Sequence, residues 1–577
     1  MMSVGKKLSI AFYWHMHQPV YQLNSESDYL MPWVRLHGVK DYLDMVLILN
    51  NFKELKLNFN IVPALLDAFI DYGEKGYHDI HSRLTVADVS EFSSDDKEFI
   101  LNNFFDANYT SMIYHHEPYS KLYQKRCSNE NSSINDFSDQ EYSDIMAWFN
   151  LAWIDPIYKN MFPELQKILD KGSNYTLEDR LEIIEIHRKI IRMIIPAYKE
   201  FLEKGRIEVT TSPYYHPILP ILLDVKSSQE NLSTVDSTLV DLDMAEDAKI
   251  QTKFALDRIE EVLGKRPKGI WPSEQSVSAE ELELFKGLGI QWTISDEGIL
   301  TNSINFEFVR DFKGHLEDPY HLMKSYKYKT KSSNIQVIFR DSVIPNLISF
   351  EYPNHEPKTA AADLYDRIKV IQNKLQSSPD KCHLLTIAMD GENCWENYLE
   401  DGQDFLNEIY SMIEEDESLE TVLISEYLDK EKYHKPLETI YAGSWINKNF
   451  QLWIGEPVKN LAWNYLKQVK DDLNKFIKDN PKNKNVEFAH KELMIAQGSD
   501  WFWWYGEDHF TEFSLEFDAL FREHLIHIYR LMGKEVPSHL WDPIITNTAL
   551  KLTSRKPHTM ISPEIGTQHS SFYDWVG

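Results

Sequence analysis

The sequence has little cysteine and no long apolar run. Its 577 residues include three cysteines, Cys127, Cys382 and Cys394, and none of them forms a CxxC pair. Three cysteines cannot build a disulfide framework, and the absence of CxxC spacing argues against a cysteine-based zinc site. A reducing compartment is therefore the simpler expectation.

Targeting and membrane signals are also missing. The N-terminal segment, MMSVGKKLSIAFYWHMHQP, contains an apolar run that is too short, and too polar at its end, for a signal peptide. No stretch reaches the length of a membrane span. We therefore expect a soluble, cytoplasmic protein.

Basic residues are scarce relative to acidic ones. The chain has 60 Lys and Arg against 90 Asp and Glu, which gives a formal net charge of -30. Nucleic acids and anionic membranes are bound through basic patches, so the charge excludes both as expected partners and favours a neutral substrate. Hydrophobic residues at 43% and aromatic residues at 13% are ample for a packed core. The oligomeric state stays open.

Short apolar runs that end in polar or charged residues recur along the chain. They are Ser9–Trp14, Leu57–Val62, Ile207–Thr211, Gly269–Trp271, Gln291–Ser295, Ile335–Phe339 and Leu384–Met389. Such runs are typical of buried parallel strands. Amphipathic helical patterns lie between them, over Leu181–Lys204, Ala245–Leu263, Ala279–Leu288, Thr359–Leu375 and Phe405–Ile413. This alternation predicts an α/β sheet or barrel.

The pattern changes after about Glu426. Helical patterns then follow one another without strands, over Leu461–Ile477, Val486–Ala496 and Phe513–Leu531. We therefore predict a barrel domain over residues 1–428, a helical subdomain over 429–548 and an irregular tail over 549–577. Segments rich in Ser, Asn and Asp at 127–144 and 226–243 are expected to be surface excursions of the barrel domain.

Five segments concentrate polar and aromatic residues. They are HMHQP from His15, TTSPYYHPILP from Thr210, GIWPSEQS from Gly269, MDGEN from Met389 and GSDWFWWYG from Gly498. The first four lie at or just after the ends of predicted strands, where parallel barrels bind their ligands. The aromatic run from Trp501 to Tyr505 fits either core packing or stacking against sugar rings, and we expect both roles within it.

His15 and His17 are two residues apart and face the same side of a strand. Such a pair can bind a metal, donate hydrogen bonds to a sugar, or be purely structural. Glu274 and Asp390 are carboxylates at predicted strand ends beside tryptophans. Glycosidic bond cleavage needs such a pair, because one carboxylic acid protonates the leaving oxygen while the other attacks or activates water.

In this order, the five segments resemble the five sequence motifs of glycoside hydrolase family 57, a family of retaining α-glucan-active enzymes. The flanking segments MPWVRLHGVKDY and LAWIDP resemble its amylase and amylopullulanase branch. The HMHQP form is unlike the first motif of the branching enzymes, which disfavours that activity. The similarity extends from about Leu8 to Arg530, and five ordered motifs are far more specific than any one of them.

The resemblance implies an incomplete (β/α)7 barrel followed by a C-terminal helical bundle that closes over the cleft. It implies Glu274 as the nucleophile and Asp390 as the general acid/base, with no cofactor and no metal. The positions that it implies for the sugar subsites are His15, His17, Glu208, His216, Trp271, Asp500 and Trp501.

Several functions remain compatible with these residues. The leading hypothesis is hydrolysis of α-1,4 bonds in α-glucans, with α-1,6 bonds as a further candidate. A 4-α-glucanotransferase would differ only in whether a sugar hydroxyl or water resolves the glycosyl-enzyme. A metal-dependent hydrolase would use His15 and His17 with His216 or Asp390 as a third ligand. A silent glucan-binding protein is disfavoured, because both carboxylates are present.

Overall fold

The computed structural model describes residues 7–545, except 25–26, 129–132, 230–233, 240, 379, 381, 432–433, 510 and 512. The expected tail over 549–577 lies outside the described residues. Within them, no helix is both long enough and apolar enough to cross a membrane.

Seven strands form the barrel. They are β1 (Leu8–Met16), β2 (Leu57–Ile61), β3 (Ile207–Thr210), β4 (Gly269–Ile270), β5 (Trp292–Asp296), β7 (Asn334–Arg340) and β8 (Leu384–Asp390). Parallel pairing gives the order β3-β2-β1-β8 in one sheet and β7-β5-β4 in the other. Each strand lies on one of the apolar runs in the sequence, so the prediction of seven buried parallel strands is confirmed.

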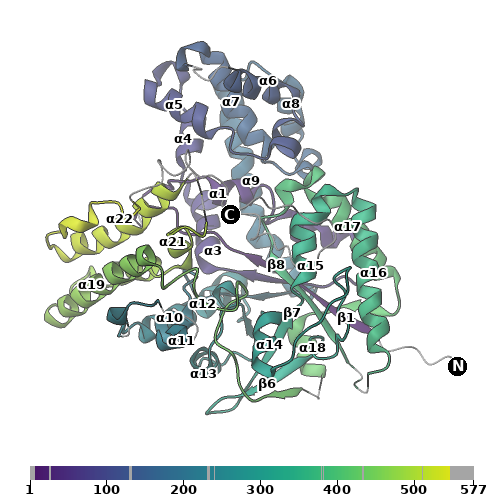
Figure 1. Cartoon of the computed structure of the whole chain (residues 1–577). Helices are drawn as coiled ribbons and strands as arrows, with labels where there is room; N and C mark the ends of the chain where they lie inside the picture. Colours follow the sequence, from purple (N-terminus) through teal and green to yellow (C-terminus); the bar gives the residue numbers. More distant parts are fainter. Residues whose placement is uncertain are drawn as a thin grey trace, which may run out of the picture.

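Two junctions join the sheets into a ring. A parallel bridge between Thr211 and Ile270 connects β3 to β4. At the other side, the Asp341 N–H donates to the Thr386 carbonyl at 3.1 Å and connects β7 to β8. The predicted (β/α)7 barrel is therefore confirmed, with helices α9 (Leu177–Glu203), α12 (Ala245–Leu263) and α16 (Pro357–Leu375) among those around it (Figure 1).

Three short strands were not expected. β6 (Ser325–Lys329) pairs antiparallel to β7, β10 (Lys435–Leu437) pairs with β6, and β9 (Leu419–Thr421) lies beside the start of β1. β6 reads SYKYK and alternates between buried and exposed residues only in part. Strands this short and polar lack the apolar run by which the seven barrel strands are recognised.

Large side chains fill the barrel. On β1, residues 11, 13 and 15 share one face because side chains alternate along a strand. Tyr13 hydrogen-bonds to Thr210 and packs edge-on against Trp271, with ring centroids 4.9 Å apart. Ala11, Tyr13 and Trp271 belong to one buried cluster that also includes residues of α18 (Ile424–Lys430). This packed interior supports the residues at the carboxyl ends of the strands.

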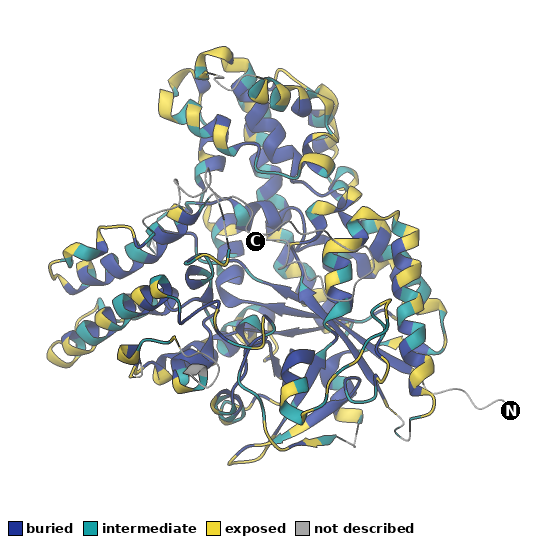
Figure 2. Cartoon of the chain, in the orientation of Figure 1, coloured by how far each residue is buried: buried dark blue, intermediate teal, exposed yellow. Residues whose placement is uncertain are grey.

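A helical lobe lies between β2 and β3 and forms the upper part of Figure 1. It contains α4 (Ile80–Thr85), α5 (Ser94–Asn103), α6 (Glu117–Cys127), α7 (Asp139–Ala152) and α8 (Pro163–Lys171). The expected surface excursion over 127–144 is thus the connection between α6 and α7 together with the start of α7. The tips of this lobe are exposed and its inner faces are buried (Figure 2).

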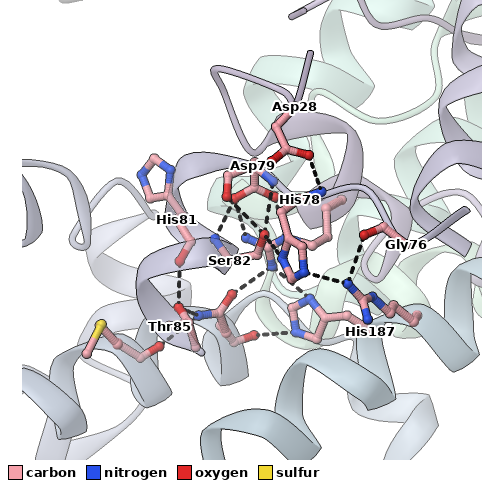
Figure 3. Close-up of polar contacts among 12 residues, drawn as sticks. Asp28, Gly76, His78, Asp79, His81, Ser82, Thr85 and His187 are labelled. Atoms are coloured by element: carbon pink, nitrogen blue, oxygen red, sulfur yellow. Dashed lines mark hydrogen bonds and ion pairs between the residues drawn. The ribbon is translucent and has the colours of Figure 1, made fainter. Parts of the chain in front are cut away.

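A buried polar network joins this lobe to the barrel domain. Arg35, in α1 (Trp33–Gly38), donates to Asp79 at 2.6 Å and to Asn150 at 2.7 Å. Asp79 also accepts the Ser82 N–H at the start of α4. Figure 3 shows Asp79 and Ser82 close together, with His187 of α9 nearby. The arginine of the MPWVRLHGVKDY segment therefore has a structural role.

The C-terminal helices are α19 (Pro457–Asp479), α20 (Val486–Ala496), α21 (Ser499–Trp503) and α22 (Ser514–Met532). The expected boundary between residues 428 and 429 falls inside α18, and β10 after it still pairs with the barrel sheet. In the structure the purely helical part begins with α19, which lies beside α22 in Figure 1.

Candidate active site

Residues from all five sequence segments meet at the carboxyl edge of the barrel. His15 is paired in register with Asp390 on β8 and with Asn60 on β2. Glu274 follows β4, and Asp500 lies in the first turn of α21. Parallel strands that end at one edge bring side chains together even when hundreds of residues separate them in sequence.

Glu274 is held by Trp445. The Trp445 indole N–H donates to Oε2 of Glu274 at 2.9 Å, and the Trp445 backbone N–H donates to the Glu274 carbonyl at 3.2 Å. The backbone of Glu274 has a φ of 57°, a left-handed conformation that non-glycine residues rarely adopt and that recurs at functional sites. Burial and the charge of Asp390 raise the pKa of Glu274 to about 8.

Asp390 is the second carboxylate. Asn393 donates to its Oδ2 at 3.2 Å. Burial raises its pKa, while the Asn393 hydrogen bond and the positive charge of Arg340 act in the opposite direction. Since both groups are desolvated and the charge of Asp390 disfavours ionisation of Glu274, we expect the pair to hold one proton near neutral pH. One acid and one base are therefore available together.

Three histidines lie next to this pair. His15 donates to Asn60 at 2.6 Å and stacks on Trp271, with ring centroids 4.8 Å apart. His17 donates to Asp500 at 2.8 Å and stacks on His216 with centroids 4.0 Å apart. Burial lowers the pKa of His15 to about 3 and that of His216 well below its ordinary value, so both rings are neutral. Neutral imidazoles can donate to and accept from sugar hydroxyls.

Exposure divides the site into two layers. The side chains of His17, Asp500 and Glu274 are 12%, 16% and 18% exposed, whereas His15, His216 and Trp271 are buried. His216 shares a hydrogen bond of 3.0 Å with Ser499. Only the outer layer reaches solvent, and the buried layer packs beneath it.

Two predicted subsite residues do not join the cluster. Glu208 is in register with Asn58, two residues before the level of Asn60 and Thr210, and it accepts the Ser425 N–H at 2.7 Å. It therefore caps α18 inside the barrel. Trp501 is 2% exposed and donates to the Ile495 carbonyl at 2.8 Å, so its described contacts are those of a core residue.

Sequence reasoning missed three residues of the site. Trp445 lies in a loop outside all five segments, and no local pattern marks it. Arg340 is the last residue of β7, so the strand-end argument could have found it; it lies 4.4 Å from the Trp445 ring. Glu392, within MDGEN, is buried and accepts the His17 N–H at 3.1 Å.

The site also has a group that could bind a metal. His17, His216 and Asp500 each offer one ligand atom, and these atoms all lie within 4.8 Å of one another. His15 is not part of this group. Of the histidine pair that the sequence suggests for a metal, only His17 belongs to this group, because His15 hydrogen-bonds to Asn60 and stacks on Trp271.

Several solved structures share the fold. A family 57 branching enzyme from Thermococcus kodakaraensis has 13% identity over 91% of this chain and 90% of its own, with a TM-score of 0.57. The α-amylase AmyC from Thermotoga maritima has 14% identity, coverage of 91% and 93%, and a TM-score of 0.54. A 4-alpha-glucanotransferase from Thermococcus litoralis has 14% identity, coverage of 91% and 60%, and a TM-score of 0.50. At such identities, these structures support the fold alone.

Two sequence comparisons give different results. A comparison with curated proteins finds no significant match. The model of the family described as "Glycosyl hydrolase family 57" matches residues 11–443, which is well over half of the 577 residues. The match covers the barrel strands and both carboxylates, and on this evidence the chain belongs to glycosyl hydrolase family 57.

Proposed function

We propose that this chain is a retaining glycoside hydrolase that cleaves α-1,4-glucosidic bonds in α-glucans or maltooligosaccharides, in the manner of the amylase and amylopullulanase branch. The observation that carries the proposal is the position of two buried carboxyl groups, Glu274 after β4 and Asp390 at the end of β8, at the carboxyl edge of the barrel, where burial raises the pKa of both. Family membership and the resemblance of the flanking segments support the choice of substrate.

The mechanism needs two steps. In the first, a Glu274 oxygen bonds to the anomeric carbon while the glycosidic C–O bond breaks and Asp390 gives its proton to the leaving oxygen. In the second, Asp390 takes a proton from water, the water oxygen bonds to the anomeric carbon, and the ester to Glu274 breaks. His17 and Asp500, which are partly exposed beside the pair, are placed to bind sugar hydroxyls.

Product analysis tests this proposal. Maltoheptaose, glycogen and pullulan are incubated with the enzyme, and the products are separated by size. Shorter products alone, released first as the α-anomer in proton NMR, would support retaining hydrolysis. Products longer than maltoheptaose would identify a 4-α-glucanotransferase on the same scaffold, and cleavage of pullulan would add α-1,6 activity. Release of the β-anomer would contradict the retaining mechanism.

One specific observation favours the alternative of a metal-dependent hydrolase, namely the grouping of His17, His216 and Asp500. A catalytic zinc site needs three protein ligands and an open position for water. We propose instead that these side chains bind sugar. The test removes metal with a strong chelator, confirms the removal by elemental analysis and assays cleavage at 25 °C. Full activity supports the sugar-binding role, whereas a loss that zinc alone restores would support the metal hydrolase.

A further inference from the structure

Two segments that resemble the family lie outside the catalytic pair and meet elsewhere in the fold. MPWVRLHGVKDY contributes Asp41 and, just beyond it, Asp44 at the start of α2 (Asp44–Leu47). LAWIDP contributes Asp155, and the turn η12 (Leu399–Gly402) contributes Asp401. The four residues are between 0% and 3% exposed. The negative charge of four buried carboxylates close together must be compensated by cations or removed by protonation.

The geometry of three of them fits one ion. Asp44, Asp155 and Asp401 each offer one oxygen atom, and these atoms all lie within 4.8 Å of one another. Calcium binds oxygen ligands at about 2.3–2.6 Å, so two ligands on opposite sides of one ion are about 5 Å apart. A single calcium ion can therefore touch all three carboxylates.

Each of the four carboxylates has one oxygen that is used and one that is not. The used oxygens accept from His37, Lys40, Gln403 and the Ile157 N–H. The other oxygens, Asp41 Oδ1, Asp44 Oδ1, Asp155 Oδ2 and Asp401 Oδ2, accept no hydrogen bond from a donor among the described residues, and the carboxyl groups of Asp155 and Asp401 are close enough to share a proton. Buried polar atoms are nearly always satisfied, so this set calls for a ligand or for bound protons.

A side chain outside the carboxylate set points to a ligand as well. Tyr158 is fully buried and its hydroxyl has no partner among the described residues. The charges of Asp44 and Asp155 add to burial in raising the pKa of this hydroxyl, which places it beside the cluster. A buried hydroxyl without a partner, beside carboxylates that also have unpartnered oxygens, is an arrangement that a bound ion would complete.

Few positively charged side chains lie near these four carboxylates. Lys40 is the one lysine or arginine, within the described part of the chain, that pairs with the four carboxylates. His37 contacts Asp41, but burial lowers the pKa of His37 to about 4, so its ring is neutral. A pocket lined by His115, His116 and Lys40 borders Asp401.

We propose that Asp44, Asp155 and Asp401, with Asp41 and Tyr158 beside them, form a structural calcium site. The ligands are hard oxygens without nitrogen or sulfur, which is the donor set for calcium or magnesium. Such an ion would tie the helical lobe to the turn that follows the MDGEN segment. The inference is independent of the proposed function, because none of these residues belongs to the catalytic pair or its histidines.

The competing explanation is that protons compensate the charge. Burial and mutual repulsion raise the pKa values of Asp44 and Asp155, so two neighbouring carboxyls could share a proton instead of an ion. The two explanations predict different effects for Asp44→Asn when calcium is present. An amide replaces a protonated carboxyl at little cost, but it removes a charged ligand from a calcium site.

The experiment uses the full chain, stripped with EDTA and then freed of chelator. Calcium is titrated by calorimetry, melting is followed with and without calcium, and Tb³⁺ luminescence sensitised by Tyr158 or the neighbouring Trp153 reports the location. We expect about one ion per chain and a rise in Tm of about 2 °C at hundredfold excess over Kd. In Asp44→Asn, the melting shift and the luminescence should both disappear, while the Tm without calcium stays equal to that of wild type or higher.

Asp247→Asn is the matched control. Asp247 is also buried, but it is paired with Lys470 at 2.7 Å and accepts from Gln497 at 2.9 Å. This variant should lose stability and keep the full calcium shift. A stripped wild-type protein that binds neither calcium nor Tb³⁺ would overturn the proposal, whatever the variants do. A site that prefers Mg²⁺ would overturn the assignment to calcium, and unchanged calcium binding in both Asp44→Asn and Asp155→Asn would overturn the location.

Discussion

Replacing Trp445 with phenylalanine isolates one hydrogen bond in the active site. The change removes the indole N–H that donates to Glu274 Oε2 at 2.9 Å. It keeps an aromatic ring against Trp271, whose centroid lies 5.7 Å from that of Trp445, and under Arg340 at 4.4 Å. The packing around Glu274 is therefore largely retained, and the effect of the variant reports the hydrogen bond.

The size of the effect follows from the strength of a hydrogen bond to an ionised carboxylate. A hydrogen bond to a charged group contributes about 1.5–3 kcal/mol, and one pKa unit corresponds to about 1.4 kcal/mol. Glu274 is only 18% exposed, so solvent screens this interaction little. Loss of the bond should raise the pKa of Glu274 from about 8 by about 1–2 units.

The productive form has Glu274 ionised and the proton on Asp390. A rise of 1–2 units in the Glu274 pKa reduces the population of that form about 10- to 100-fold, with the same fall in kcat/KM at the pH optimum. The assay is the pH dependence of kcat/KM on maltoheptaose. The wild-type profile should be bell-shaped and should decline above about pH 8, where the last proton leaves the pair, and the basic limb should move upward in Trp445→Phe.

Trp463→Phe is the control, because it removes an indole hydrogen bond of 2.8 Å from α19 to the carbonyl of Trp453, in the segment just before that helix. It should lower stability and leave the pH profile in place. A Trp445→Phe enzyme with wild-type kcat/KM and an unmoved basic limb would refute the reasoning. So would a basic limb that moves to lower pH.

Three further variants test other parts of the site. Glu274→Gln should abolish turnover and keep maltooligosaccharide binding. The pKa of Glu274 is about 8 in the folded protein and 4.5 ordinarily, so the unfolding free energy of the wild type falls as the pH rises from 4.5 to 8. The variant should lack this fall and therefore melt at a higher temperature than the wild type at pH 8. An active Glu274→Gln enzyme would contradict the nucleophile assignment. Trp501→Ala should cost about 3–5 kcal/mol in stability, measured by urea unfolding, while the folded enzyme keeps its specific activity. A kinetic defect at unchanged stability would restore its role in a subsite. Glu208→Gln should lower Tm with KM unchanged, since Glu208 caps α18, and a raised KM at wild-type Tm would argue for sugar contact.

The sequence alone predicted the seven strands of the barrel and most of the helices around it. This works because a buried parallel strand needs a local run of apolar residues and an amphipathic helix needs a local period. The strand-end positions of the two carboxylates also follow from sequence, since Asp390 comes directly after such a run and Glu274 comes three residues after another. Position at a strand end is a local property, and in a parallel barrel it places side chains at the carboxyl edge.

Only the tertiary structure decided which of these side chains meet, and in which layer. Trp445 is 171 residues from Glu274, and no local pattern connects them, because the hydrogen bond forms between a loop and a strand end. Glu208 lies only eight residues before His216, yet Glu208 caps α18 inside the barrel and His216 stacks on His17, because β3 ends at Thr210 and His216 lies in the loop beyond it. The acidic cluster around Asp44 likewise depends on contacts among segments more than one hundred residues apart. Local periodicity determines which elements form, but burial and charge compensation depend on the packing of all of them.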